Sequence, residues 1–237
     1  AQKILQSGNG TNDMGNSIFV DSNGNYYVTG VLNSYITLFK YNSASVLVFG
    51  TSFPDLPGTG NSIYVDAGGN IYITGRYTPV SNVNADDLIT LKFNSTGTQL
   101  WNAKLTVTST NDYGLKVLAD ANGNVFVAAN NDNTQGRIIK YNSSGILIAN
   151  SLASNSTDIT DMVLDSFGDV FLCGNQVGNG LVRVYTNSLS LIWSALADDP
   201  NQTIMFRAMV IDASLNVYLT GSFANTTYTT MYNSSGV

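Results

Sequence analysis

Residues 17–30 read SIFVDSNGNYYVTG, and residues 62–75 repeat the pattern as SIYVDAGGNIYITG. Three later segments follow it: KVLADANGNVFVAA at 116–129, MVLDSFGDVFLCGN at 162–175 and MVIDASLNVYLTG at 209–221. Each segment has a run of β-branched and aromatic residues, then an aspartate that opens a short turn, then a second such run. This order predicts a hairpin of two antiparallel strands in every segment.

The turn aspartates mark an internal repeat, because they recur at spacings of 45, 54, 45 and 47 residues (Asp21, Asp66, Asp120, Asp165 and Asp212). A third strand is expected after each hairpin, over 36–42, 88–94, 136–142, 181–187 and 228–233. A fourth strand is expected over 46–53, 99–106, 146–153 and 191–197. Self-similarity at this period is typical of propellers and solenoids, and no segment shows sustained helical periodicity.

We therefore expect an all-β chain: a five-bladed β-propeller of four-stranded antiparallel blades, forming a single domain over residues 1–237. The fifth repeat ends at Val237, where its fourth strand should begin. A strand-like segment at the other end is expected to complete that last blade as an N-terminal strand (Ala1, Gln2, Lys3, Ile4, Leu5 and Gln6). Such a strand closes its own ring or is added to a neighbouring copy, and the sequence leaves both open.

The composition argues against several classes of function. The 237 residues include 10 Lys and Arg against 16 Asp, with no Glu and no His, so the net charge is −6. Nucleic-acid binding requires a basic surface, and we expect no nucleic-acid partner. No apolar run approaches the ~18 residues that span a bilayer, so no membrane-spanning segment is expected. The single cysteine, Cys173, excludes an internal disulfide and is expected to pack between blades.

One family resemblance can be stated on these residues. The motif Asp-x-x-Gly-Asn-x-Tyr-Val-Thr-Gly, followed by Lys-Tyr-Asn-x-x-Gly and a Trp-bearing strand, resembles the bacterial SBBP-type β-propeller repeat and, more loosely, NHL repeats. The chain departs from the pattern at Leu215, which replaces the turn glycine, and at Ala129, which replaces the strand-ending glycine. The resemblance implies a protein that is extracellular or on a cell or virion surface, with mainly interaction roles, and it transfers no site residue.

The repeated turn acids admit a second interpretation as cation ligands. Asp21 and Asn25 offer oxygen atoms at alternate positions, as at the start of a calcium-binding loop. Such a loop is completed by a glutamate, which this chain lacks, and Asp also opens turns by accepting bonds from the backbone two residues on. We therefore expect turns, no cofactor and no metal site, with at most a weakly bound surface cation such as calcium.

Paired carboxylates raise an alternative, an Asp-dependent glycoside hydrolase, because some five-bladed propellers that cleave glycosides place carboxylates around the axis. That likeness is an analogy of fold alone. The candidate pairs are Asp86 with Asp87, Asp198 with Asp199, and Asp158 with Asp161. No pair recurs at matched positions on different repeats, so the sequence favours a protein that is not an enzyme.

A ligand-binding rim is expected where the sequence repeats least. In a propeller, the loops between second and third strands and those between blades emerge on the same face. The longest of them here is residues 76–87. Amide groups and rings on this face suit sugars, which present hydroxyls and C–H surfaces. The expected rim residues are Arg76, Tyr77, Asp86, Asp87, Tyr113, Asn130, Asp132, Asn175 and Gln176.

Together these observations favour a secreted, non-enzymatic interaction module that recognises a glycan or a protein, with carbohydrate binding or adhesion as its role. The alternative is a structural subunit that self-assembles into an extracellular filament, sheath or surface layer. A surface with few charges suits both, since few charged groups lose their hydration at a contact.

Overall fold

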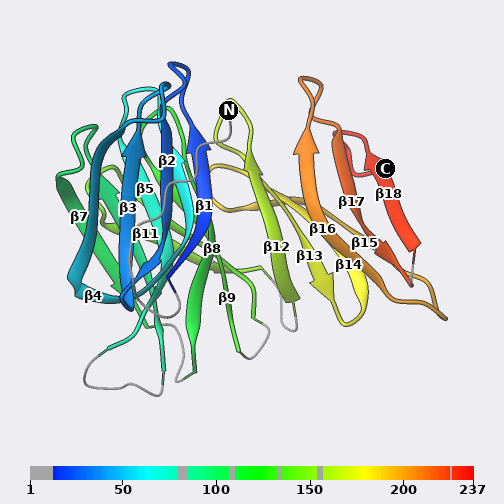
Figure 1. Cartoon of the computed structure of the whole chain (residues 1–237). Coiled ribbons are helices and arrows are strands. Elements are labelled where there is room, and N and C mark those ends of the chain that lie inside the picture. Colours follow the sequence, from blue (N-terminus) through cyan, green and yellow to red (C-terminus); the bar gives the residue numbers. More distant parts are fainter. Residues whose placement is uncertain (1–12, 80–84, 107–109, 133–134, 154–156, 225) are drawn as a thin grey trace. The chain divides into compact units, whose positions relative to one another are not determined.

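The computed structural model describes residues 13–79, 85–106, 110–132, 135–153, 157–224 and 226–237 (Figure 1). The predicted closing strand, Ala1 to Gln6, lies outside these residues. The chain divides into two compact units, Ala1–Val117 and Leu118–Val237. In the described ranges no helix has the length and hydropathy needed to cross a bilayer.

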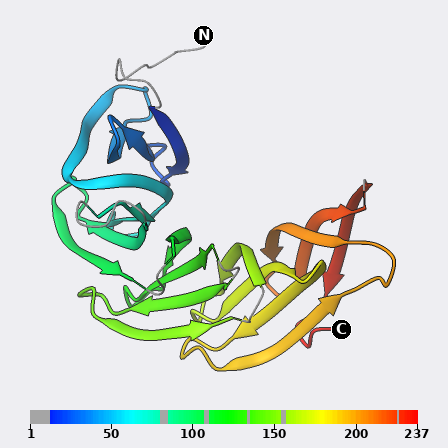
Figure 2. The same cartoon turned by 90° about the horizontal axis from the view of Figure 1, so that it is seen from below.

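The first unit contains seven strands in sequential order, with antiparallel pairing between neighbours. They are β1 (Met14–Val20), β2 (Tyr26–Leu32), β3 (Tyr35–Tyr41), β4 (Leu47–Val65), β5 (Ile71–Tyr77), β6 (Asp87–Phe93) and β7 (Gln99–Leu105). Strand β4 pairs with β3 through residues 47–52 and again at Pro57, and with β5 through residues 58–65. It therefore serves as the outer strand of one four-stranded sheet and the inner strand of the next, and Figure 2 shows how strongly it bends between them.

Three further sheets follow along the chain. Strands β8 (Asp112–Ala119), β9 (Val125–Asn131), β10 (Arg137–Tyr141) and β11 (Leu147–Leu152) form one, in the order β11-β10-β9-β8. Strands β12 (Thr157–Leu164), β13 (Val170–Gln176), β14 (Asn179–Tyr185) and β15 (Leu191–Ala197) form another. The last sheet has three strands, β16 (Ile204–Ile211), β17 (Val217–Phe223) and β18 (Thr226–Tyr232).

The prediction of an all-β chain built from antiparallel four-stranded sheets is confirmed, and every predicted hairpin is present. The exact number of blades is not settled by sheets of seven, four, four and three strands. A closed ring of five blades and a single domain over 1–237 therefore stay predictions.

The aspartate of each hairpin stabilises its turn. Asp21 Oδ1 accepts hydrogen bonds of 2.9 Å from the N–H groups of Asn23 and Asn25. Its Oδ2 accepts one from the Asn25 side-chain amide at 2.9 Å and one from the Tyr27 hydroxyl at 3.1 Å. Burial raises the pKa of Asp21, but these hydrogen bonds outweigh it and hold the pKa below its usual value. Burial and the bond to Asp21 raise the pKa of Tyr27 to about 12.

These contacts favour the turn interpretation of the repeated aspartates over the calcium one, since both oxygens of Asp21 already serve groups of the turn itself. The same arrangement recurs at Asp212, which binds Ser214, Asn216 and Tyr218. Among the described residues, no group of three or more acidic or cysteine side chains could hold a metal ion.

The innermost strand of four sheets carries a β-bulge at the same repeat position. The register shifts between Gly15 and Ser17, between Gly60 and Ser62, between Ile159 and Asp161, and between Phe206 and Ala208. A bulge leaves one residue unpaired and re-aims its side chain. The unpaired residues are Asn16, Asn61, Thr160 and Arg207.

Side chains at and beside the bulge bind the backbone of the following inner strand. Asn16 Nδ2 donates to the Gly60 carbonyl and Asn61 Nδ2 to the Gly114 carbonyl, both at 2.9 Å. At three of the bulges the next residue accepts in return: Ser17 Oγ takes the Ile63 N–H at 3.2 Å, and Ser62 and Asp161 take the N–H groups of Val117 and Met209. We call this pair of contacts the inner-strand lock, and it links β1 to β4, β4 to β8 and β12 to β16.

Apolar packing between sheets forms the core. In the second unit Cys173 is fully buried in a cluster with residues of β14, β16 and β17, including Val182, Phe206 and Leu219, as expected for a thiol packed between blades. In the first unit a matching cluster joins residues of β2 to β6, among them Ile36, Ile73 and Phe93.

Candidate functional site

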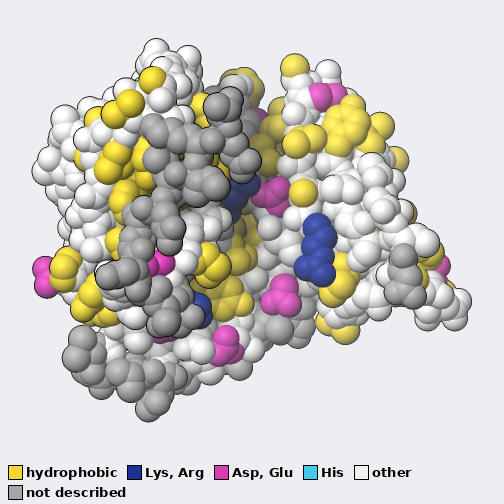
Figure 3. Space-filling model, viewed as in Figure 1, with side chains coloured by type: hydrophobic (Ala, Val, Ile, Leu, Met, Phe, Trp, Pro, Cys, Tyr) yellow, Lys and Arg dark blue, Asp and Glu magenta, His cyan; other side chains and the backbone are white. Residues whose placement is uncertain are grey.

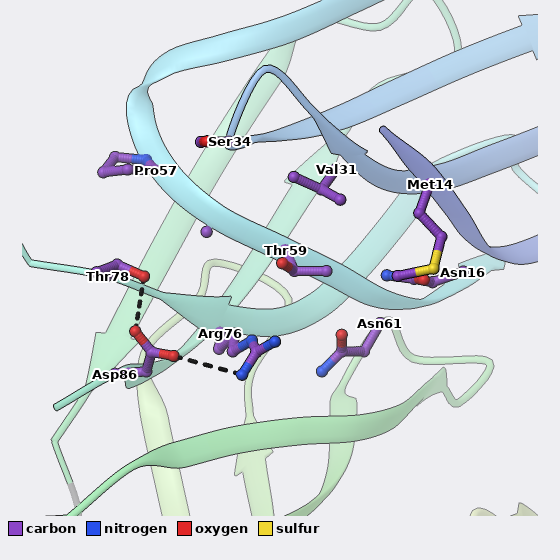
Figure 4. A pocket seen from close by; sticks show the side chains of 11 residues that line it. Met14, Asn16, Val31, Ser34, Pro57, Thr59, Asn61, Arg76, Thr78 and Asp86 are labelled. Carbon is purple, nitrogen blue, oxygen red and sulfur yellow. Dashed lines mark hydrogen bonds and ion pairs between the residues drawn. The ribbon is translucent and has the colours of Figure 1, made fainter. Parts of the chain in front are cut away.

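The first unit contains a pocket of about 650 Å³ at the beginnings of its inner strands and the ends of β2 and β5 (Figure 4). This is the end of the sheets at which the sequence places the least repetitive loops. The lining combines polar and apolar groups: Asn16, Ser34, Thr59, Asn61, Arg76, Thr78 and Asp86 with Met14, Val31, Pro57 and Gly58.

Two amides of the pocket are held in place by the inner-strand lock. Asn16 and Asn61 are the unpaired bulge residues of β1 and β4. The bulge changes the direction in which their side chains point. Each amide nitrogen is committed to a backbone carbonyl of the next inner strand. This bond fixes the amide plane and leaves each Oδ1 as an acceptor with a defined direction.

Asp86 is the acid that lines the pocket, and hydrogen bonds hold it in place. Its Oδ1 accepts a 2.6 Å hydrogen bond from the Thr78 hydroxyl. Its N–H donates to Asn111 Oδ1 and its carbonyl accepts the N–H of Asp112, both at 2.8 Å. The segment before β8 thereby positions a carboxylate whose side chain is only 16 % exposed.

Arg76 lies near the end of β5, where its backbone pairs with Thr59 and Leu88. Its side chain lies beside that of Asp86. Its Nη1 lies 3.6 Å from Asp86 Oδ2, which makes an ion pair but exceeds the usual length of a charge-assisted hydrogen bond. The Arg76 side chain is 51 % exposed, and Figure 4 shows it between Asp86 and Asn61.

Of the rim residues expected in the first unit, Arg76 and Asp86 line the pocket and the other three do not. The Tyr77 ring packs on the core cluster and has the Lys104 ammonium 3.5 Å from its centre. Asp87 begins β6 and pairs with Tyr77. Tyr113 is part-buried in β8.

The other four expected rim residues belong to the second unit and are not grouped with the pocket. Asn130 is buried, and its amide binds both the N–H and the carbonyl of Ile159 at 3.0 Å, which is a structural contact. Asp132 is exposed just after β9. Asn175 is buried in β13, and Gln176 ends that strand in register with Asn179.

Two of the six carboxylates weighed for glycoside hydrolysis bind backbone N–H groups. Asp161 accepts the N–H of Met162 at 2.9 Å and that of Met209 at 3.0 Å, so it takes the part of the serine in the inner-strand lock. Asp199 accepts the N–H of Asn201 at 2.8 Å and closes a turn. Asp158 pairs with Asn175 across β12 and β13.

Sequence reasoning missed Asn16 and Asn61 as pocket residues. A signal was present, because the first two repeats alone carry Gly-Asn-Ser immediately before the apolar run of the inner strand, at 15–17 and 60–62. Asparagine is so frequent elsewhere in the chain that this motif did not stand out.

No family model matches this chain, and no curated protein matches its sequence. Solved structures do resemble it. A structure called "Dos1 propeller" has a TM-score of 0.63 at 13 % identity, with 91 % of this chain and 55 % of that chain covered. The fold is that of a β-propeller.

Two further structures of the same fold are called enzymes. Virginiamycin B lyase from Staphylococcus aureus has a TM-score of 0.60 at 12 % identity, with 92 % of this chain and 69 % of that chain covered. A periplasmic gluconolactonase from Pseudomonas aeruginosa has a TM-score of 0.62 at 10 % identity, with coverage of 94 % and 69 %.

These likenesses change two expectations from the sequence. The prediction that the chain is not an enzyme is wrong, because solved structures of the same fold are called lyases and gluconolactonases. The propeller part of the family resemblance is confirmed by the solved structures, whereas its assignment to the SBBP or NHL type is not.

Proposed function

We propose that this protein is a β-propeller of five blades that acts outside the cytoplasm and binds a saccharide in the pocket of its first unit. The observation that supports this most is the make-up of the pocket. Directed amides and hydroxyls stand beside apolar side chains in about 650 Å³, within the usual range of small-molecule sites.

The chemistry of a sugar matches these groups. The Oδ1 atoms of Asn16 and Asn61 accept hydrogen bonds from sugar hydroxyls, and the hydroxyls of Ser34 and Thr59 either donate or accept. Met14, Val31 and Pro57 offer an apolar surface for the C–H groups of a ring. A location outside the cytoplasm agrees with the structural neighbour that is called periplasmic.

A glycan array followed by titration calorimetry tests the proposal. Val31→Trp fills the pocket and is expected to weaken saccharide binding at least tenfold. Val46→Trp, at an exposed position of the same unit outside the pocket, is the matched control and should leave affinity unchanged. Unchanged affinity in folded Val31→Trp protein would place any binding elsewhere.

A second candidate, self-assembly into a filament, sheath or layer, has its own observation. The outermost strands expose an apolar side chain at a shared bulge position: Val48, Leu100, Ile148 and Ile192 are each about half-exposed. Charged residues make up only 11 % of the chain, and Figure 3 shows hydrophobic side chains at many places on one face. Edge strands with apolar, uncharged residues favour association between chains.

Light scattering and negative-stain electron microscopy on one sample test this second candidate. We expect regular assemblies that dissociate in the double variant Ile148→Lys, Ile192→Lys and persist in Val177→Lys, whose residue is exposed at a turn instead. A single species near 25 kDa at all concentrations would exclude assembly as the function.

A further inference from the structure

We propose that the saccharide bound in the pocket carries a carboxylate, as a uronic acid does, and that Arg76 binds this carboxylate. The inference rests on the proposed saccharide-binding function and adds the chemical class of the ligand. The contacts of the Arg76 guanidinium are the observations that support this inference.

The Arg76 guanidinium makes no hydrogen bond to the described part of the chain. Its ion pair with Asp86 Oδ2, at 3.6 Å, is the one polar contact found for it there. Other arginines differ: Arg137 donates to Asn150 Oδ1 at 3.1 Å, and Arg183 donates to the Ala153 carbonyl. A guanidinium has five N–H donors in a planar fork, so Arg76 brings an uncommitted fork to the pocket wall.

Asp86 does not depend on Arg76 for its own position. The Thr78 hydroxyl binds its carboxylate at 2.6 Å, and contacts to Asn111 and Asp112 hold its backbone. Arg76 is therefore able to bind a ligand while Asp86 keeps the hydrogen bonds that hold it in place.

The planar fork favours a carboxylate over other anions. Two parallel N–H groups match the two oxygens of a carboxylate, which gives a bidentate pair stronger than a neutral hydrogen bond. The lining holds one arginine, no lysine and one acid, so its net charge is zero, and a bound carboxylate adds one negative charge where a phosphate adds nearly two. The amides and hydroxyls around Arg76 remain for the ring hydroxyls of the same sugar.

The test compares a panel of uronate oligosaccharides (galacturonate, glucuronate and mannuronate) with their methyl esters, by titration calorimetry on the full chain. The ester keeps every hydroxyl and removes the charge. We expect at least one acid to bind at least tenfold more tightly than its ester. Arg76→Gln should abolish this preference, and Arg76→Lys should restore only part of it, because an ammonium lacks the fork.

Arg137→Gln, the same substitution in the second unit, is the control and should retain the full preference. Equal binding of acid and ester, or a preference that survives Arg76→Gln, would overturn the inference while leaving saccharide binding intact. Binding of neutral sugars alone on the array would have the same meaning. Failure of every saccharide to bind would overturn both the inference and the proposed function.

Discussion

Single residues in this repeat carry backbone strain at defined places. Val177 has φ of 50° at the turn between β13 and β14, although a β-branched side chain strongly disfavours this left-handed conformation. Its side chain is 79 % exposed, so little packing offsets the strain. The first repeat uses Asn33 and Ser34 at the corresponding turn, and asparagine tolerates this conformation.

Relief of that strain is measurable. Val177→Asn is expected to stabilise the protein by about 1 kcal/mol, since the left-handed conformation costs a β-branched residue roughly 1–2 kcal/mol. Thermal unfolding should shift upward by about 2–4 °C. Val20→Asn, at an exposed position with ordinary strand geometry, should give no gain. A stabilisation of the same size in both variants would contradict the explanation by strain.

At the scale of the residue, the sequence predicted the turn aspartates well because their turn partners lie within six positions of the chain, although Asp120 also binds the distant Asn187. It also singled out Leu215, which stands where other repeats have glycine. The structure keeps the turn there, with Leu215 at φ of 61°, and packs its side chain against the core cluster. The apolar contact offsets the conformational cost, which the local sequence alone did not reveal.

At the scale of the element, the inner strand and its neighbour approach unusually closely. A Cβ built on Gly75 would overlap the carbonyl oxygen of Thr59, and the same holds at Gly30, Gly174 and Gly221 with their own inner strands. The repeated glycine therefore reflects the approach of two backbones beside the bulge. Residue propensities alone would explain this glycine only as the residue that ends a strand.

The close approach of Gly75 to Thr59 links the stability of the protein to the shape of the pocket, because Thr59 lines the pocket. Gly75→Ala is expected to cost about 2–3 kcal/mol by overpacking and to weaken saccharide binding as the inner strand moves. Gly68→Ala is the matched control, since its Cβ would meet only side-chain atoms at 3.3 Å or more and its turn conformation does not require glycine. Chemical denaturation and calorimetry measure both effects. Equal stability of the two variants would contradict the close-approach argument.

The strands themselves were largely predictable, but their continuity was not. The sequence indicates a strand at 46–53 and a new hairpin from about residue 60. In the structure β4 runs unbroken from Leu47 to Val65. Pro54 stands in neither register, and Pro57 pairs with Tyr35 while its carbonyl accepts the Thr78 N–H, so neither proline has to donate a ladder hydrogen bond.

At the scale of the whole molecule, the repeat predicted the fold class and only part of the site. Nine rim residues were expected on one face, yet two of them line the pocket and four belong to the second unit. A repeat pattern identifies which loops share a face. It does not identify which side chains are already engaged in hydrogen bonds that stabilise the fold. Asn130 illustrates this, because its amide binds the backbone of Ile159 on both sides.

The inner-strand lock bears on how such a chain could lengthen or shorten. In each lock a side chain of one repeat binds main-chain atoms of the next, as Asn16 binds the carbonyl of Gly60. A duplicated copy of the first, second or fourth repeat would carry its donor along and would meet a main-chain acceptor in its successor. Gain of such a repeat therefore needs no compensating side chain in its neighbour, whereas insertion within a repeat displaces donor from acceptor.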